Sequence, residues 1–256
     1  MTEPAGPHSD RNRRFEGRRI YLTGAASGIG RATAQLLAQG GAAVALVDVN
    51  ADGLERVAAA TGGRPFVVNL CDGDAAARSV EEAANALGGL DGVINCAGEG
   101  YGCPLDQLEP AKWDQVIALN LTAPYRICRA ALPWLKAAPA ASIVNIASGV
   151  ALLPSGPGAS VYAASKGGLL SFSKALAKEL APTIRVNTVC PGVVDTPMTA
   201  QIRGNPAAAE AFISLYALKR VADPLELAEA IAFLTSSEAS FITGVVLAVD
   251  GGRSFH

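Results

Sequence analysis

The sequence is poor in charged residues, in aromatic residues and in long apolar runs. Only 17% of its 256 residues are charged and 5% are aromatic, and the formal net charge is −2. This balance excludes the strongly basic surface typical of proteins that bind nucleic acid or acidic membranes. The apolar run Ala42–Val47 is far shorter than the roughly 20 residues that span a bilayer. Since half of the residues are apolar, we expect a globular protein with neither a nucleic-acid nor a membrane partner.

Cysteine is scarce as well, and its spacing excludes the common zinc motifs. There is no Cys-x-x-Cys pair and no nearby pair of histidines, so we expect no metal site and reduced thiols in a cytoplasmic protein. The first residues lack the apolar segment of a signal peptide. We predict a flexible polar tail over residues 1–17 and a single domain over residues 18–256. The five cysteines are Cys71, Cys96, Cys103, Cys128 and Cys190.

Short apolar runs alternate with longer Ala- and Leu-rich stretches, which is typical of βαβ units and a parallel sheet. The pattern predicts an α/β fold: a Rossmann-type, doubly wound parallel sheet of about seven strands with helices on both faces. The predicted strands are Arg19–Thr23, Ala43–Asp48, Pro65–Leu70, Gly92–Cys96, Ser142–Ala147, Ile184–Cys190 and Val245–Val249. The predicted helices are Arg31–Gln39, Gly53–Thr61, Asp74–Leu87, Lys112–Leu135, Val161–Ala181 and Pro224–Thr235.

An insertion at about residues 196–220 interrupts this alternation. Gly204, Asn205 and Pro206 lie within it between Ala-rich stretches, so we predict two short helices about a flexible joint. Inserted segments of this kind commonly form lids over binding sites, and we expect a lid here.

A glycine-rich segment follows the first predicted strand directly. Residues 23–30 read TGAASGIG and precede a helix, an arrangement that lets backbone N–H groups approach a pyrophosphate. Asp48 ends the second predicted strand, where a carboxylate accepts hydrogen bonds from the ribose of an adenosine. The same carboxylate repels the 2′-phosphate of NADP. These residues therefore predict NAD as the cofactor.

The segment YAASK places a phenol and an ammonium group four residues apart, at Tyr162 and Lys166. On a helix, residues at this spacing lie on one face and can act on one reacting centre. A nearby ammonium group stabilises a phenolate, so the pair is suited to acid/base chemistry.

Together these motifs resemble the short-chain dehydrogenase/reductase family over residues 18–252. The quoted segments are TGAASGIG (23–30), Asp48, NCAG (95–98), Asn120 in LNLT, Ser148 in VNIAS, YAASK (162–166) and PGVVDTP (191–197). The resemblance implies that Tyr162 is the general acid/base, that Lys166 binds the nicotinamide ribose and lowers the pKa of Tyr162, that Ser148 holds the substrate oxygen and that Asn120 completes a proton relay. It also implies that the cofactor is bound by Gly24, Ser27, Gly28, Ile29, Gly30, Asp48, Asn69, Leu70, Asn95, Ala97, Gly98, Tyr162, Lys166, Pro191, Val194 and Thr196.

Three positions depart from the family pattern. The second Asn of its NNAG segment is Cys96, and its usual Asp after the third strand is Asn69, which meets adenine without charge. Ser148 also precedes Tyr162 by more residues than is usual, so we expect the intervening loop to bulge over the pocket.

The leading functional hypothesis is an NAD-dependent oxidoreductase that moves a hydride between the cofactor and a secondary alcohol or ketone, with substrate contacts from Ser148 and Tyr162. An apolar or cyclic substrate is favoured by the side chains expected near the pocket, which are Glu99, Tyr101, Cys103, Leu152, Leu153, Met198, Ile202, Phe212 and Leu215. A 3-oxoacyl carrier-protein reductase and a non-catalytic NAD-binding scaffold are the alternatives.

We predict a homotetramer, because two separate surfaces need to be covered. One is formed by apolar residues on the two longest predicted helices, and the other by the final strand at the edge of the sheet.

Overall fold

The computed structural model describes residues 13–154, 156–200 and 206–254. Its seven strands form one sheet in the order β3-β2-β1-β4-β5-β6-β7, and every neighbouring pair is parallel. The strands are β1 (Arg19–Thr23), β2 (Ala43–Asp48), β3 (Arg64–Val67), β4 (Gly92–Asn95), β5 (Ala141–Ile146), β6 (Ile184–Pro191) and β7 (Val246–Val249). The predicted doubly wound parallel sheet is confirmed.

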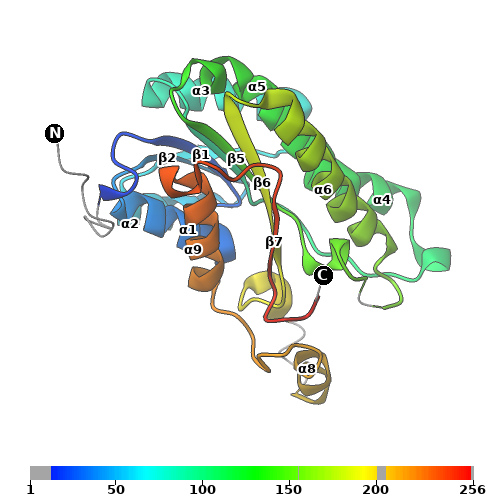
Figure 1. Cartoon of the computed structure of the whole chain (residues 1–256). Coiled ribbons are helices and arrows are strands. Elements are labelled where there is room, and N and C mark those ends of the chain that lie inside the picture. Colours follow the sequence, from blue (N-terminus) through cyan, green and yellow to red (C-terminus); the bar gives the residue numbers. More distant parts are fainter. Residues whose placement is uncertain (1–12, 155, 201–205, 255–256) are drawn as a thin grey trace.

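Helices cover both faces of this sheet (Figure 1). They are α1 (Gly28–Gln39), α2 (Ala51–Thr61), α3 (Gly73–Leu87), α4 (Pro110–Ile117), α5 (Ala123–Ala137), α6 (Ser160–Leu180), α8 (Pro206–Ile213) and α9 (Pro224–Thr235). Helices α1, α2 and α9 pack on one face, and α3, α5 and α6 pack on the other.

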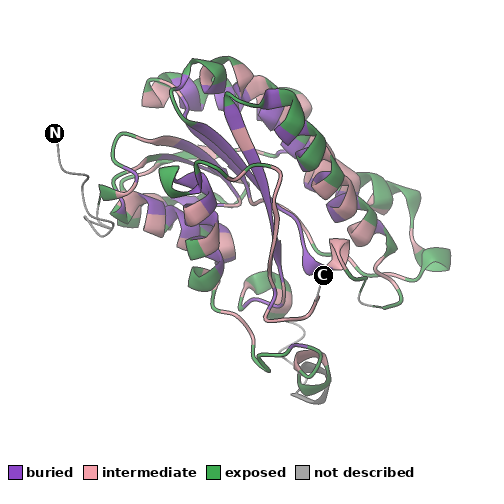
Figure 2. Ribbon diagram, in the orientation of Figure 1, coloured by how far each residue is buried: buried purple, intermediate pink, exposed green. Residues whose placement is uncertain are grey.

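Alternation along the strands explains the two layers. In β1, Ile20 and Leu22 join the core beneath α1 and α9, whereas Tyr21 joins the core beneath α3 and α5. All three are fully buried, because a parallel sheet covered on both faces has no solvent-facing side. Figure 2 shows the buried strands between helices whose outer surfaces are exposed.

The predicted strand Pro65–Leu70 is wrong in its second half. β3 ends at Val67, and the chain then turns, with the Asn69 side chain accepting the Cys71 N–H at 3.1 Å. Asp72 caps α3 by accepting the N–H groups of Asp74 and Ala75. In this turn, hydrogen bonds between polar side chains and the backbone take the place of the backbone hydrogen bonds between strands. The apolar pattern of the sequence does not show this change, so the predicted strand was too long.

The predicted helix Lys112–Leu135 is not one regular helix. α4 and α5 are joined by a π-helical turn, Ala118–Thr122, with Asn120 buried at its centre. A π turn carries one residue more than an α turn, so it resets which side chains face the sheet.

The predicted tail is too long at its C-terminal end. Phe15 is 1% exposed in the core, and Arg14 forms an ion pair with Glu238 at 2.6 Å. Residues 13–17 thus pack on the body, and residues 1–12 lie outside the described ranges.

Only part of the predicted lid is described. α8 is one short helix, while Gly204 and Asn205 lie outside the described residues, so the flexible joint stays a prediction. Among the described ranges, no helix is both long and apolar enough to cross a membrane.

Candidate active site

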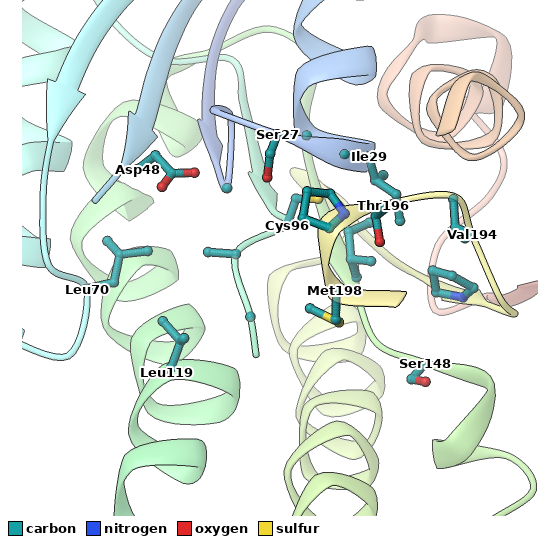
Figure 3. Close-up of a pocket in the computed structure, with 18 of the residues that line it drawn as sticks. Ser27, Ile29, Asp48, Leu70, Cys96, Leu119, Ser148, Val194, Thr196 and Met198 are labelled. Carbon is teal, nitrogen blue, oxygen red and sulfur yellow. The ribbon is translucent and has the colours of Figure 1, made fainter. Parts of the chain in front are cut away.

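A cavity of about 480 Å³ lies at the carboxyl ends of the central strands. β1 stands between β2 and β4, so the connections that follow these strands diverge to opposite faces of the sheet at this point. A crevice opens where the strand order reverses, and this is where doubly wound folds bind their ligands. Figure 3 shows Asp48, Leu70 and Leu119 on one side of the cavity, Ser148 on the other, and Ser27, Ile29 and Thr196 between them.

The glycine loop forms the floor of the cavity. Gly24 and Gly28 have φ angles of 69° and 50°, a region that side chains disfavour. A Cβ at Gly30 would lie 2.0 Å from the Gly24 carbonyl oxygen, and a Cβ at Gly24 would lie 2.8 Å from the Ala97 nitrogen. Only glycine therefore allows this loop, which brings the N-terminus of α1 to the cavity as an anion-binding site.

The Asp48 carboxylate is held rigidly at one end of the cavity. Its Oδ2 accepts the Ala26 N–H at 3.1 Å, and its Oδ1 accepts the Asn50 N–H at 3.0 Å. Both oxygens keep a free lone pair, because a carboxylate accepts about four hydrogen bonds. Asp48 is thus oriented by the backbone to accept two neighbouring hydroxyl groups.

Tyr162 and Lys166 lie on the first turns of α6 and line the opposite part of the cavity. Burial raises the pKa of Tyr162 above its usual value, and a hydrogen bond with the Ser148 side chain partly opposes this effect. Ser148 and Tyr162 thus line the same cavity.

Lys166 is 4% exposed, and its Nζ donates to the Ile146 carbonyl oxygen at 2.9 Å. Burial lowers the pKa of Lys166 to about 8, because the protein interior solvates an ammonium group poorly. The thiols of Cys96 and Cys190 lie near it, and burial raises the pKa values of these thiols to about 12 and about 11. Both are neutral at physiological pH, so neither offsets the charge of Lys166.

Asn120 stands one layer behind the cavity. Its Oδ1 accepts the Glu99 N–H, and its Nδ2 donates to the Glu99 carbonyl, each at 2.9 Å, and to the Ser165 hydroxyl at 3.1 Å. A Cβ at Gly98 would lie 3.0 Å from both Asn120 Oδ1 and Lys166 Nζ. A side chain at residue 98 would therefore press on both groups, and glycine lets them approach the backbone closely.

The segment after β6 closes the cavity over the glycine loop. A Cβ at Gly28 would lie 2.9 Å from Thr196 Cγ2, so Thr196 packs directly against the loop. The Val194 carbonyl accepts the Thr199 hydroxyl, which stabilises the turn.

Most of the predicted cofactor residues line this one cavity. They are Gly24, Ser27, Gly28, Ile29, Gly30, Asp48, Asn69, Leu70, Ala97, Gly98, Tyr162, Lys166, Pro191, Val194 and Thr196, and Ser148 lines it with them.

Asn95 is the exception, and its predicted cofactor contact stays a prediction. It is 2% exposed, does not line the cavity, and donates from Nδ2 to Asn145 Oδ1 at 2.8 Å. Asn145 in turn donates to Ser173, so Asn95 joins β4, β5 and α6 through a buried polar chain.

The predicted substrate side chains are dispersed. Met198 lines the cavity, whereas Glu99 turns to α4 and pairs with Lys112 at 2.9 Å, and Tyr101 covers the Lys112 ammonium group. The remaining candidates do not line it: Cys103, Leu152, Leu153, Phe212 and Leu215; Ile202 lies outside the described residues.

Several lining residues carry no sequence signal of their own, namely Val49, Val68, Cys71, Gln115, Leu119 and Gly192. The sequence could have indicated them only through adjacent residues that were predicted to belong to the site, since Leu119 precedes Asn120 and Cys71 follows Leu70.

Comparisons with known proteins agree with this geometry. Residues 24–254 match a family model described as enoyl-(acyl carrier protein) reductase. A 3-oxoacyl-[acyl-carrier-protein] reductase of Thermotoga maritima is 39% identical over 93% of this chain and 98% of its own. A cis-4-hydroxycyclohexanecarboxylate dehydrogenase of Sinomonas cyclohexanicum is 40% identical over 93% of this chain and 97% of its own. The crystal structure of a 3-ketoacyl-(acyl-carrier-protein) reductase from Brucella melitensis complexed with NADH is 36% identical, covers 94% of this chain and 100% of its own, and has a TM-score of 0.88.

Proposed function

The chain belongs to the short-chain dehydrogenase/reductase family of nicotinamide-dependent oxidoreductases that act on CH–OH groups, and we propose that it uses NAD to oxidise an apolar, cyclic secondary alcohol. The observation that carries the choice of NAD is the Asp48 carboxylate, fixed by two backbone N–H groups at the cavity. A fixed carboxylate accepts ribose hydroxyls and repels a 2′-phosphate.

The residues around the cavity suit the parts of such a cofactor. The glycine loop and the N-terminus of α1 would hold the pyrophosphate, Asp48 the adenosine ribose, and Lys166 the nicotinamide ribose. When bound, the nicotinamide accepts the hydride. Thr196 and Val194 would contact its carboxamide.

The protein's own part in the reaction is to move a proton. We assign the general base to Tyr162, which takes the proton of the substrate hydroxyl, and the stabilisation of the developing alkoxide to Ser148. The Lys166 ammonium stabilises the Tyr162 phenolate. We assign the completion of a proton relay to Asn120, whose Oδ1 approaches Gly98 as Lys166 Nζ does.

An apolar substrate is supported by the cavity's lining, in which Ile146 and Met198 take part. The relative from Sinomonas cyclohexanicum, named as a dehydrogenase of a hydroxycyclohexane acid, supports a cyclic alcohol. A 3-oxoacyl carrier-protein reductase remains the second candidate, because the Thermotoga maritima relative of that name matches over nearly its full length.

We expect purified protein to reduce NAD with cyclic secondary alcohols and to favour NAD over NADP by at least about tenfold in kcat/KM, a difference of about 1.4 kcal/mol. Asp48→Ala should narrow this ratio, because it removes both the attraction for ribose and the repulsion of phosphate. Nicotinamide absorbance measures the reaction.

The exposed Asp52 on α2 provides a matched control, and Asp52→Ala should leave the cofactor ratio unchanged. Preference for NADPH with a 3-oxoacyl thioester would support the carrier-protein reductase instead. Tight NAD binding without turnover of any alcohol or ketone would indicate a scaffold.

We also propose that the chain is a homotetramer with two kinds of interface. Trp113 on α4 and Tyr125 on α5 are 38% and 44% exposed, and Phe241, fully exposed, precedes the edge strand β7. Exposed apolar side chains on two separate surfaces favour two isologous contacts.

Light scattering should give a mass about four times the 26.1 kDa of one chain. Phe241→Asp should reduce the assembly to dimers at micromolar concentration, because it places a charge in one interface. A wild-type mass of one or two chains would refute the tetramer.

A further inference from the structure

Glu99 lies in the loop after β4 (residues 96–104) and binds α4 and the π turn that follows it at two separate places. Its backbone N–H donates to Asn120 Oδ1, and its backbone carbonyl accepts from Asn120 Nδ2, each at 2.9 Å. Its carboxylate Oε2 accepts from Lys112 Nζ at 2.9 Å and from Gln115 Nε2 at 3.4 Å. Lys112 and Gln115 belong to α4, and Asn120 belongs to the π turn. One residue thus fastens the loop to both parts of this unit.

The ion pair between Glu99 and Lys112 is shielded from solvent. The two side chains are 25% and 24% exposed, and the Lys112 ammonium group lies 4.8 Å from the centre of the Tyr101 ring. In the described part of the chain, Glu99 Oε1 is buried and has no hydrogen-bond partner, so the charge of this carboxylate depends chiefly on Lys112. Removing one partner of a shielded pair leaves the other charge uncompensated, so the two side chains depend on each other.

The orientation of Asn120 depends on the Glu99 backbone. Asn120 is fully buried at the centre of the π turn, a type of turn that is rare and is often found at functional sites. Its Nδ2 also donates to the Ser165 hydroxyl at 3.1 Å, but Glu99 supplies both the donor to Oδ1 and the other acceptor of Nδ2. A displaced Glu99 would therefore release two of the three bonds that hold this amide.

The same loop reaches the groups assigned to catalysis. Gly98 precedes Glu99 and lines the cavity, and a Cβ at Gly98 would lie 3.0 Å from both Asn120 Oδ1 and Lys166 Nζ. Movement of the loop would thus change how both groups approach it. Small displacements of groups at a reacting centre lower rates by up to about 100-fold.

We propose that Glu99 is a positioning residue, whose ion pair with Lys112 holds the loop after β4 against α4 and so orients Asn120. This inference rests on the proposed function, which assigns the completion of the proton relay to Asn120. Glu99 itself does not line the cavity, so it acts through Asn120 rather than on the substrate. The glycine loop and Asp48 belong to other segments, and cofactor binding there should not depend on this ion pair.

The test compares Glu99→Leu, Lys112→Met and Glu99→Gln with the wild-type protein in the oxidation of cyclopentanol or cyclohexanol by NAD, whichever is faster. Glu99→Leu and Lys112→Met should each lower kcat by about tenfold, because the loop is no longer fastened to α4. Glu99→Gln should lower it by about twofold or less, since its amide oxygen still accepts from Lys112. The dissociation constant of NADH, measured by fluorescence, should stay within about twofold of wild type in every variant.

Two further measurements separate positioning from a general structural defect. The solvent deuterium isotope effect on kcat should be larger in Glu99→Leu and Lys112→Met than in wild type, because a disturbed relay makes proton transfer limit turnover. The double variant should lose about tenfold rather than about 100-fold in kcat, because both substitutions break the same pair. The matched control is Glu109→Leu, an exposed position at the start of α4 whose side chain does not cap the helix, and it should keep the wild-type kcat.

Three results would overturn the inference and leave the proposed function standing. They are a wild-type kcat in Glu99→Leu or Lys112→Met, a lowered kcat with an unchanged solvent isotope effect, and losses that multiply in the double variant. Lys112→Met breaks the pair from the helix side, so it decides the matter if Glu99→Leu does not fold. A wild-type protein that oxidises neither alcohol with NAD would refute the proposed function, and the inference with it.

Discussion

Tyr162→Phe should lower kcat for alcohol oxidation by at least about 100-fold while leaving NADH binding within about twofold of wild type. The substitution removes only the phenolic oxygen, which we assign as the proton acceptor, and loss of a general base costs roughly this factor. Turnover kinetics and a fluorescence titration measure the two quantities separately. Tyr125→Phe, on the exposed side of α5, is the control and should keep full activity.

The pH profile adds an independent readout. Burial raises the pKa of Tyr162, so the phenol is protonated in the free protein at neutral pH. Because the base must be deprotonated to accept a proton, kcat/KM for alcohol oxidation should rise with pH and then level off. The small residual activity of Tyr162→Phe should lose this rise. A variant that retained wild-type turnover would exclude Tyr162 as the base.

Lys166→Met should abolish turnover and weaken NADH binding, yet make the cofactor-free protein more stable at pH 7. The pKa of Lys166 is about 8 in the folded protein, against a reference value of 10.5. At 1.36 kcal/mol per pKa unit, keeping this buried group charged costs about 3 kcal/mol. Loss of the bond to the Ile146 carbonyl offsets part of the gain, so we expect a net increase of about 2 kcal/mol in the free energy of unfolding.

The size of this effect depends on pH. Below pH 8 the ammonium group is charged in both the folded and the unfolded protein, and the full cost is present. Between pH 8 and 10.5 the unfolded chain binds more protons than the folded one, so wild-type stability rises with pH. The gap between Lys166→Met and wild type should therefore close over this range.

Urea unfolding at pH 7 and pH 10 without cofactor measures this gap. Lys174→Met, at an exposed position of α6, should change stability little at either pH. A Lys166→Met variant less stable than wild type at pH 7 would show that Lys166 contributes more as a structural donor than it costs as a buried charge.

The local parts of this protein could be predicted from the sequence by itself. The glycine loop, the strand that ends at Asp48, and the Tyr162–Lys166 pair depend on residues within one turn or one strand–helix connection. Periodicity and backbone sterics act at this range, so the sheet and most of the residues that line the cavity were predictable. The prediction that the third strand continues beyond Val67 was wrong, because a polar turn follows in which a side chain, and not a neighbouring strand, accepts the backbone hydrogen bond.

Only the tertiary structure decided which side chains reach the cavity and in what state. Asn95 and Asn120 both lie in motifs, yet neither lines the cavity. The Asn95 side chain is hydrogen-bonded to the Asn145 side chain, and the Asn120 side chain to the Glu99 backbone, which are contacts between segments far apart in the chain. The π turn before α5 and the turning of Glu99 toward Lys112 likewise depend on packing between elements. The lowered pKa of Lys166 has the same origin, because desolvation is set by everything that surrounds the ammonium group rather than by its neighbours in sequence.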